Sequence, residues 1–107
     1  MTIKEAAETI FTREDVIRIK EHISNNKEMI SVDLHGLTVA KAKRLLSNII
    51  ALDKDGKDIL IIHGYNHGTA IKDMVNDEKL LNNPRISKRE TSIYNLGQTK
   101  LKIKTIA

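Results

Sequence analysis

The chain has 107 residues, no cysteine and a formal net charge of +4. The lack of cysteine excludes disulfide bonds, thiolate nucleophiles and thiolate metal sites, so any metal would need histidine and carboxylate ligands. The first residues lack the apolar core of a signal peptide, and no apolar run approaches the roughly 18 residues of a membrane span. We therefore expect one small soluble domain in the cytoplasm, without a membrane partner.

The first 28 residues are predicted to form a helical extension. Thr12 is a suitable N-cap, and the apolar residues that follow it recur on one side of a helix that would run to about Asn25. A short helix is expected before Thr12. The pattern therefore divides the chain into an N-terminal extension, residues 1–28, and a folded domain, residues 29–107.

Two strand–helix units follow the extension. A β-branched run predicts a strand from Met29 to Leu34, and Thr38 caps a helix of about 15 residues with a buried apolar stripe. A wholly apolar run from Ile59 to Ile62 predicts a strand that is covered on both faces or central in a parallel sheet. Thr69 is placed to cap the next helix.

The C-terminal segment predicts two strands, over about 85–91 and 98–106, which complete the order βαβαββ. Residues 85–107 carry six basic side chains against Glu90 alone. Lys100, Lys102 and Lys104 alternate with apolar residues and predict a basic row on one face of the last strand. This row is either a phosphate-binding stripe or a solvated face whose lysines protect an edge strand.

The first strand ends in Asp33-Leu34-His35-Gly36. Asp33 and His35 are two residues apart in a strand, so both point to the same face and Asp33 is expected to hold the imidazole in one tautomer. Gly36 lets a phosphate approach the backbone at the start of the next helix. The alternative is that Asp33 caps a local turn and His35 is structural.

The second strand ends in His63-Gly64-Tyr65-Asn66-His67-Gly68. His63 and His35 are a candidate acid–base pair, because histidine serves either proton-transfer role near neutral pH. With Asp33 they also suit zinc or manganese, but neither a third carboxylate nor a compact histidine pair supports a metal site. We therefore expect no cofactor, with a divalent metal as the less favoured alternative.

Further nucleic-acid contacts are expected around these catalytic candidates, Asp33, His35 and His63. The candidates are Gly36, Lys41, Gly64, His67, Gly68 and Lys72. The two lysines lie one turn into their helices, although exposed lysines are often simply solvated. His67 is equally a phosphate contact or an exposed loop residue. Tyr65 is the one aromatic side chain placed to stack on a nucleotide, and half-buried packing is its alternative.

Together these motifs resemble the small MutS-related (Smr) domain. The resemblance rests on Asp33-Leu34-His35-Gly36-Leu37-Thr38 before an alanine-containing helix, and on Ile61-Ile62-His63-Gly64 with Gly68 before a second helix. It covers about residues 29–107. It implies an α+β two-layer sandwich with two helices on a mixed four-stranded sheet, similar to the C-terminal domain of a bacterial translation initiation factor. It also implies endonuclease activity on DNA or RNA, with His63 and His35 as the acid and base of phosphodiester cleavage.

The sequence therefore predicts a nucleic-acid-binding domain that cleaves phosphodiester bonds. One alternative is a non-catalytic module that binds DNA or docks on structured RNA, such as the ribosome. Another is a protein–protein adaptor that uses residues 1–28 as a docking helix. The choice between DNA and RNA and the oligomeric state stay open at this point.

Overall fold

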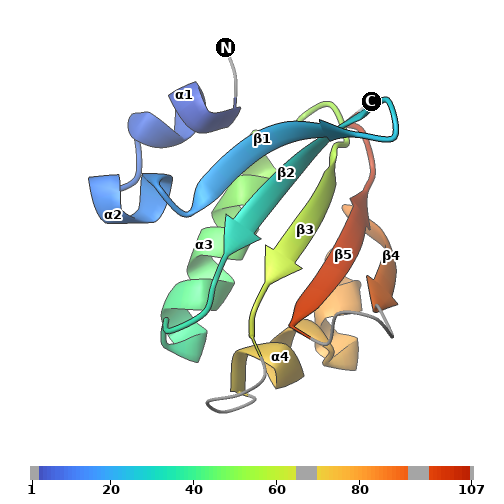
Figure 1. Ribbon diagram of the computed structural model, residues 1–107. Helices are drawn as coiled ribbons and strands as arrows, with labels where there is room; N and C mark the ends of the chain where they lie inside the picture. Colours follow the sequence, from blue (N-terminus) through green and yellow to red (C-terminus); the bar gives the residue numbers. More distant parts are fainter. Residues whose placement is uncertain (1–2, 65–69, 92–96, 107) are drawn as a thin grey trace.

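The residues that the structure describes form a mixed five-stranded sheet with helices packed against one side (Figure 1). The computed structural model describes residues 3–64, 70–91 and 97–106. The strands, in sheet order, are β1 Ile19–Ser24, β2 Lys27–Asp33, β3 Asp58–Ile62, β5 Gln98–Ile103 and β4 Ile86–Thr91. The helices are α1 Ile3–Glu8, α2 Arg13–Val16, α3 Val39–Leu52, α4 Ala70–Val75 and the 3-10 helix η1 Glu78–Asn82. This is an α+β fold.

The strand and helix order predicted for the second part of the chain is confirmed. Thr38 caps α3, because its Oγ1 accepts the N–H of Lys41 at 3.2 Å, and the apolar stripe of α3 is buried. β2, β3, β4 and β5 lie where strands were expected. α4 begins at Ala70, next to the predicted cap Thr69, which lies outside the described residues. No helix among the described residues has the length and apolar character to cross a membrane.

The helix predicted from Thr12 to about Asn25 is wrong beyond its first turn. Thr12 does cap a helix, α2, through its Oγ1, which accepts the N–H of Asp15 at 3.3 Å. Residues 19–24 instead form β1, which pairs antiparallel with β2. Asn25 and Asn26 connect the two strands with positive φ angles of 53° and 64°, a conformation that asparagine tolerates better than most residues.

Pairing with β2 explains why a strand forms here. Ile19 lies opposite Val32 and is fully buried, so β1 adds an apolar residue to the core while it hydrogen-bonds the outer edge of β2. Ile19 and Ile23 are β-branched, which favours a strand over a helix. The described sheet therefore has five strands where four were expected. The docking helix of the adaptor alternative does not form over residues 19–24.

The parallel register of β2 and β3 fixes which residues face the helices. Ile30 aligns with Ile59, and Val32 aligns with Ile61. All four side chains are fully buried in the core that α3 and α4 complete. Since side chains alternate between the two faces of a strand, the residues between them point to the other side of the sheet.

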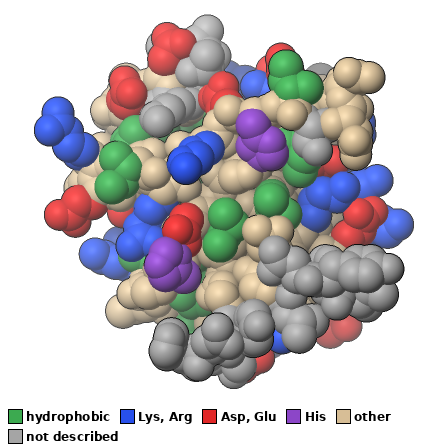
Figure 2. Space-filling view, in the orientation of Figure 1, with side chains coloured by type: hydrophobic (Ala, Val, Ile, Leu, Met, Phe, Trp, Pro, Cys, Tyr) green, Lys and Arg blue, Asp and Glu red, His purple; other side chains and the backbone are tan. Residues whose placement is uncertain are grey.

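We call that other side the open face. Ser31 aligns with Leu60 and Asp33 with Ile62, and β5 contributes Lys100 opposite Leu60. Within the described residues, no helix or strand packs over this side, which faces the viewer in Figure 1. In Figure 2, hydrophobic side chains lie near the centre of the open face and basic side chains lie on both sides of them.

Arg85 joins the end of α3 to the last strand. It donates hydrogen bonds to the carbonyl oxygens of Ile50 at 3.0 Å, of Lys104 at 2.8 Å and of Asp53. The last carbonyls of a helix lack hydrogen-bond donors within the helix, and at the end of α3 the Arg85 guanidinium supplies these donors. Burial raises the pKa of the Asp53 carboxyl, although the N–H of Lys57 donates to it at 2.8 Å and acts in the other direction.

Replacing Arg85 with methionine is expected to lower the free energy of unfolding by about 3 kcal/mol, because hydrogen bonds from a charged donor contribute about 1.5–3 kcal/mol each and do not add fully. Urea unfolding followed by circular dichroism measures the change. Lys43→Met removes the same charge from an exposed position of α3 and should cost less than about 0.5 kcal/mol. Equal stability of the two variants would contradict the role given to Arg85.

Candidate active site

Asp33 and His35 lie together at the end of β2 and form a dyad on the open face. Nδ1 of His35 donates to Oδ1 of Asp33, and the backbone N–H of His35 donates to the same oxygen at 3.1 Å. A carboxylate only accepts hydrogen bonds, so the proton of the neutral imidazole lies on Nδ1 and the lone pair on Nε2. The His35 side chain is 65% exposed. The dyad therefore has the arrangement of an oriented general base.

Arg18 fixes the end of β2 beside the dyad. Its Nη1 donates to the carbonyl oxygens of Asp33 and His35, each at 3.0 Å, and the N–H of Asp33 donates to the Arg18 carbonyl at 2.9 Å. This guanidinium adds a permanent positive charge beside the backbone of Asp33 and His35. Sequence reasoning misses Arg18, because it lies 15 residues before Asp33 and approaches it only through the pairing of β1 with β2.

Each of the two sequence motifs contains a glycine with a positive φ angle, Gly36 in the first and Gly64 in the second. Their φ angles are +78° and +71°, which residues with a side chain rarely adopt. A Cβ atom at Gly64 would lie 3.8 Å from the Cβ of His35, so the end of β3 approaches the dyad. At Gly36 the corresponding position has no atom within 4 Å. The backbone at Gly36 is exposed, as the predicted approach of a phosphate requires.

The structure does not bring His63 to His35. His63 is 5% exposed, with Nε2 2.9 Å from Thr99 Oγ1 and Nδ1 2.8 Å from the carbonyl oxygen of Gly64. A carbonyl only accepts, so Nδ1 donates to Gly64 and Nε2 accepts the hydroxyl of Thr99. Thr99 aligns with Ile61, which places this contact on the helix-covered face. The two histidines therefore lie on opposite faces, and the predicted acid–base pair does not form.

Lys41 and Lys72, the two helix candidates, do not lie on the open face. Lys41 is exposed in the first turn of α3 and lines a hollow of about 220 Å³ with residues of the α1–α2 connection. Lys72 is half-buried in α4, which packs on the covered side of the sheet. Tyr65, His67 and Gly68 lie outside the described residues.

The predicted basic row on the last strand is partly neutralised. Lys100 and Lys102 on β5 form ion pairs with Glu90 on β4, at 3.4 and 3.5 Å, and Lys88 pairs with the same carboxylate at 3.5 Å. Lys104 follows the end of β5 and is exposed. β5 lies between β3 and β4 in the sheet. The alternative in which these lysines protect an edge strand is therefore wrong.

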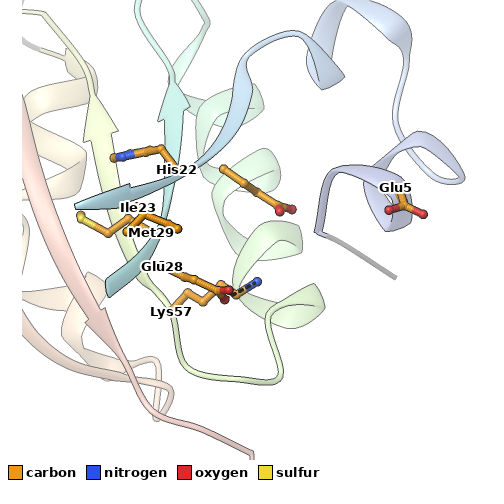
Figure 3. A pocket seen from close by; sticks show the side chains of 7 residues that line it. Glu5, His22, Ile23, Glu28, Met29 and Lys57 are labelled. Atoms are coloured by element: carbon orange, nitrogen blue, oxygen red, sulfur yellow. Dashed lines mark ion pairs between the residues drawn. The ribbon is translucent and has the colours of Figure 1, made fainter. Parts of the chain in front are cut away.

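A hollow of about 360 Å³ lies at the opposite end of β1 and β2 from the dyad. His22, Ile23 and Met29 are among the residues that line it (Figure 3). Glu28 and Lys57 also line it and form an ion pair at 3.5 Å. The dyad is not among its lining residues. The candidate site therefore lies on the exposed sheet surface, away from this hollow.

The candidate metal ligands are also separated. Within residues 3–64, 70–91 and 97–106, no three histidine, aspartate or glutamate side chains form a group that could hold a metal ion. Asp33 and His35 are in contact, but His63 lies on the other face with both ring nitrogens engaged. A metal held by these three residues together does not fit this arrangement.

Comparison with protein-family models, with curated proteins and with solved structures finds no match to this chain. The resemblance to the Smr domain therefore rests on its motif residues. The geometry of the dyad, with Arg18 and the open face around it, is the structural evidence that bears on function.

Replacing His63 with alanine is expected to lower the free energy of unfolding by about 2–4 kcal/mol, because the change leaves a buried cavity and a Thr99 hydroxyl without its partner. His35→Ala removes an exposed side chain and should cost less than about 1 kcal/mol. Urea unfolding curves of the two variants measure the difference. Equal losses of stability would contradict the separation of a structural His63 from a functional His35.

Proposed function

We propose that this protein binds nucleic acid and cleaves phosphodiester bonds, with RNA as its preferred substrate. The observation that carries the proposal is the dyad, an exposed imidazole whose Nδ1–H is held by a carboxylate. The dyad lies at the carboxyl ends of the parallel strands β2 and β3, where α/β sheets commonly bind ligands. Arg18 and the exposed backbone at Gly36 supply positive charge and space for a phosphate.

In this mechanism His35 is the general base and Asp33 orients it. Nε2 of His35 takes the proton of a ribose 2′-hydroxyl, and the oxygen attacks the adjacent phosphorus. The bond from phosphorus to the 5′ oxygen breaks, and a water molecule protonates the leaving oxygen. Asp33 stabilises the imidazolium that forms. The products are a 2′,3′-cyclic phosphate and a 5′-hydroxyl.

RNA suits this site better than DNA does. The 2′-hydroxyl is an internal nucleophile, so its attack has the large effective molarity of an intramolecular reaction. DNA lacks this group, and its cleavage usually depends on a water activated by a divalent ion with several carboxylate ligands. Asp33 is the one carboxylate in the dyad, and it is already bound to His35. We therefore expect cleavage of RNA that resists EDTA.

The order of elements supports an Smr-like domain. From β2 onward the described chain runs β2, α3, β3, α4, β4, β5, with η1 before β4, and these strands lie in the order β2-β3-β5-β4. Two helices on such a mixed sheet are similar to the arrangement that the resemblance implies, that of the C-terminal domain of a bacterial translation initiation factor. β1 adds a strand at the β2 edge of this arrangement.

A non-catalytic module that docks on structured RNA, such as the ribosome, is the second candidate. The burial of His63 favours it, because no described histidine shares the dyad's position as a general acid. The two candidates use the same surface. They differ in what His35 does, since only cleavage requires proton transfer at its Nε2.

Replacing His35 with alanine is expected to lower the cleavage rate at saturating RNA by about 10²–10⁴, with little change in binding, because proton transfer acts in the transition state. A labelled structured RNA incubated with EDTA and separated on a denaturing gel gives the rate. His22→Ala removes another exposed histidine, on β1, and should keep full activity. Equal rates for His35→Ala and the unchanged protein would point to a contaminating nuclease and favour the binding module.

The same assay tests the nucleophile. A single 2′-deoxynucleotide placed at the mapped cleavage site should abolish cutting at that site and leave 2′,3′-cyclic or 3′-phosphate ends elsewhere. Continued cutting at the substituted site would rule out attack by the 2′-hydroxyl.

A further inference from the structure

The open face carries a charged group that the cleavage chemistry does not use. Lys88, Lys100 and Lys102 surround Glu90 at 3.5, 3.4 and 3.5 Å, and we call these four residues the lysine cluster. Three lysines and one glutamate leave a net charge of +2. Desolvation acts to raise the pKa of the Glu90 carboxyl, but the three ammonium groups together lower this pKa below the ordinary value. The cluster is thus a surface where several cations converge on one anion.

An apolar strip lies between the lysine cluster and the dyad. Leu60 on β3 aligns with Lys100 across the β3–β5 pair, and Ile62 aligns with Asp33 across the β2–β3 pair. Both apolar side chains are half-buried and do not belong to the core on the helix-covered face. The open face therefore offers charge and apolar surface side by side.

The cluster and the dyad are close enough for one short ligand to contact both. Leu60 also aligns with Ser31, so Lys100 is two strands and two residues from Asp33. With strands about 4.8 Å apart and about 3.3 Å per residue, the two Cα atoms are roughly 12 Å apart. A single OB-fold, one common domain that binds unpaired strands, covers about 4–16 nucleotides, and a strand of this length spans the distance.

We propose that the open face binds a single strand of nucleic acid, with phosphates on Lys100 and Lys102 and bases over Leu60 and Ile62. This inference rests on the proposed function and specifies the form of its substrate. Unpaired strands expose the faces of their bases, whereas a duplex stacks its bases inside and presents mainly phosphates and sugars. An apolar strip beside a basic cluster therefore matches a single strand better than a duplex.

Glu90 holds the three lysines together in the free protein. A phosphate group would replace its carboxylate as their partner, because both are oxyanions that accept charge-assisted hydrogen bonds from ammonium groups. Removing the charge of Glu90 should therefore increase affinity, while removing the lysines should decrease it. A variant that merely unfolds the protein could only weaken binding. Opposite changes of affinity in the glutamate and lysine variants would therefore indicate a direct role in binding.

The test measures fluorescence anisotropy of a labelled oligothymidylate of about 12 nucleotides, which lacks the 2′-hydroxyl and so is not cut by the proposed mechanism. The double variant Lys100→Ala/Lys102→Ala should weaken binding. The slope of the logarithm of the binding constant against the logarithm of the salt concentration should become less steep by about 1.4, at about 0.7 per phosphate contact. Adding Lys104→Ala should flatten it by about 2 in total if Lys104 also touches a phosphate. Lys43→Ala/Lys54→Ala, the matched control at exposed positions of α3 and the loop after it, should leave the slope unchanged.

Two further variants separate charge from apolar contact. Glu90→Gln should tighten binding at low salt about 1.5- to 5-fold, which is the range that the energies of exposed ion pairs correspond to. Ile62→Ser should weaken binding without changing the salt slope, because it removes apolar contact and no charge. A DNA duplex of the same length should bind at least about tenfold more weakly than the single strand.

Some results would overturn this inference. One is an unchanged salt slope in the double lysine variant when its unfolding curve is normal. The others are weaker binding by Glu90→Gln and a duplex that binds as tightly as the single strand. The outcome is separable from that of the proposed function. Single-strand binding with the expected slopes but without RNA cleavage would support this inference and overturn the nuclease, whereas RNA cleavage with unchanged slopes would overturn this inference alone.

Discussion

The alternation of side chains along the parallel pair β2–β3 decides which residues of the two motifs can act together. Val32 and Ile61 align in the core, so Asp33 points to the open face. The N–H of Leu34 donates to the carbonyl of Ile62 at 2.8 Å, which continues the pairing past the end of β2 and carries the alternation to His35. A shift of one residue in the register of β2 would turn its core residues to the open face and its dyad residues to the core. The burial of apolar side chains therefore also keeps His35 exposed.

The basic side chains of the C-terminal segment divide into two groups with different physical roles. Arg85 supplies hydrogen bonds to the end of α3, and Arg89 donates to the carbonyls of Val75 at 3.3 Å and of Asp77 at 3.0 Å, after α4. Ile50 and Val75 lie in the last turns of α3 and α4, so these arginines donate to carbonyls that lack partners within their own helices. Lys100 and its neighbours in the lysine cluster instead face the open side of the sheet. Net charge alone cannot distinguish the two groups, because the distinction depends on which carbonyls the fold brings near each side chain.

Sequence patterns predict the elements whose signals are local and miss those that depend on distant partners. The cap at Thr38, the apolar stripe of α3 and the contact between Asp33 and His35 follow from spacings of a few residues. β1 was predicted as a helix because its apolar residues also fit a helical period, and pairing with β2 decides the outcome. The same pairing brings in Arg18. For His63, the motif indicates a functional residue, but only the alignment of β3 with β5 shows that its ring points into the core.

The central claim is that His35 faces a ligand on the open face while His63 is part of the core. Modification of histidines by diethyl pyrocarbonate, followed by mass spectrometry of peptides, tests it directly in the folded protein. We expect His35 to be modified rapidly, to be protected when a single-stranded oligonucleotide is bound, and His63 to stay unmodified until the protein is unfolded. Modification of His63 as fast as that of His35, or no protection of His35 by bound nucleic acid, would contradict the account.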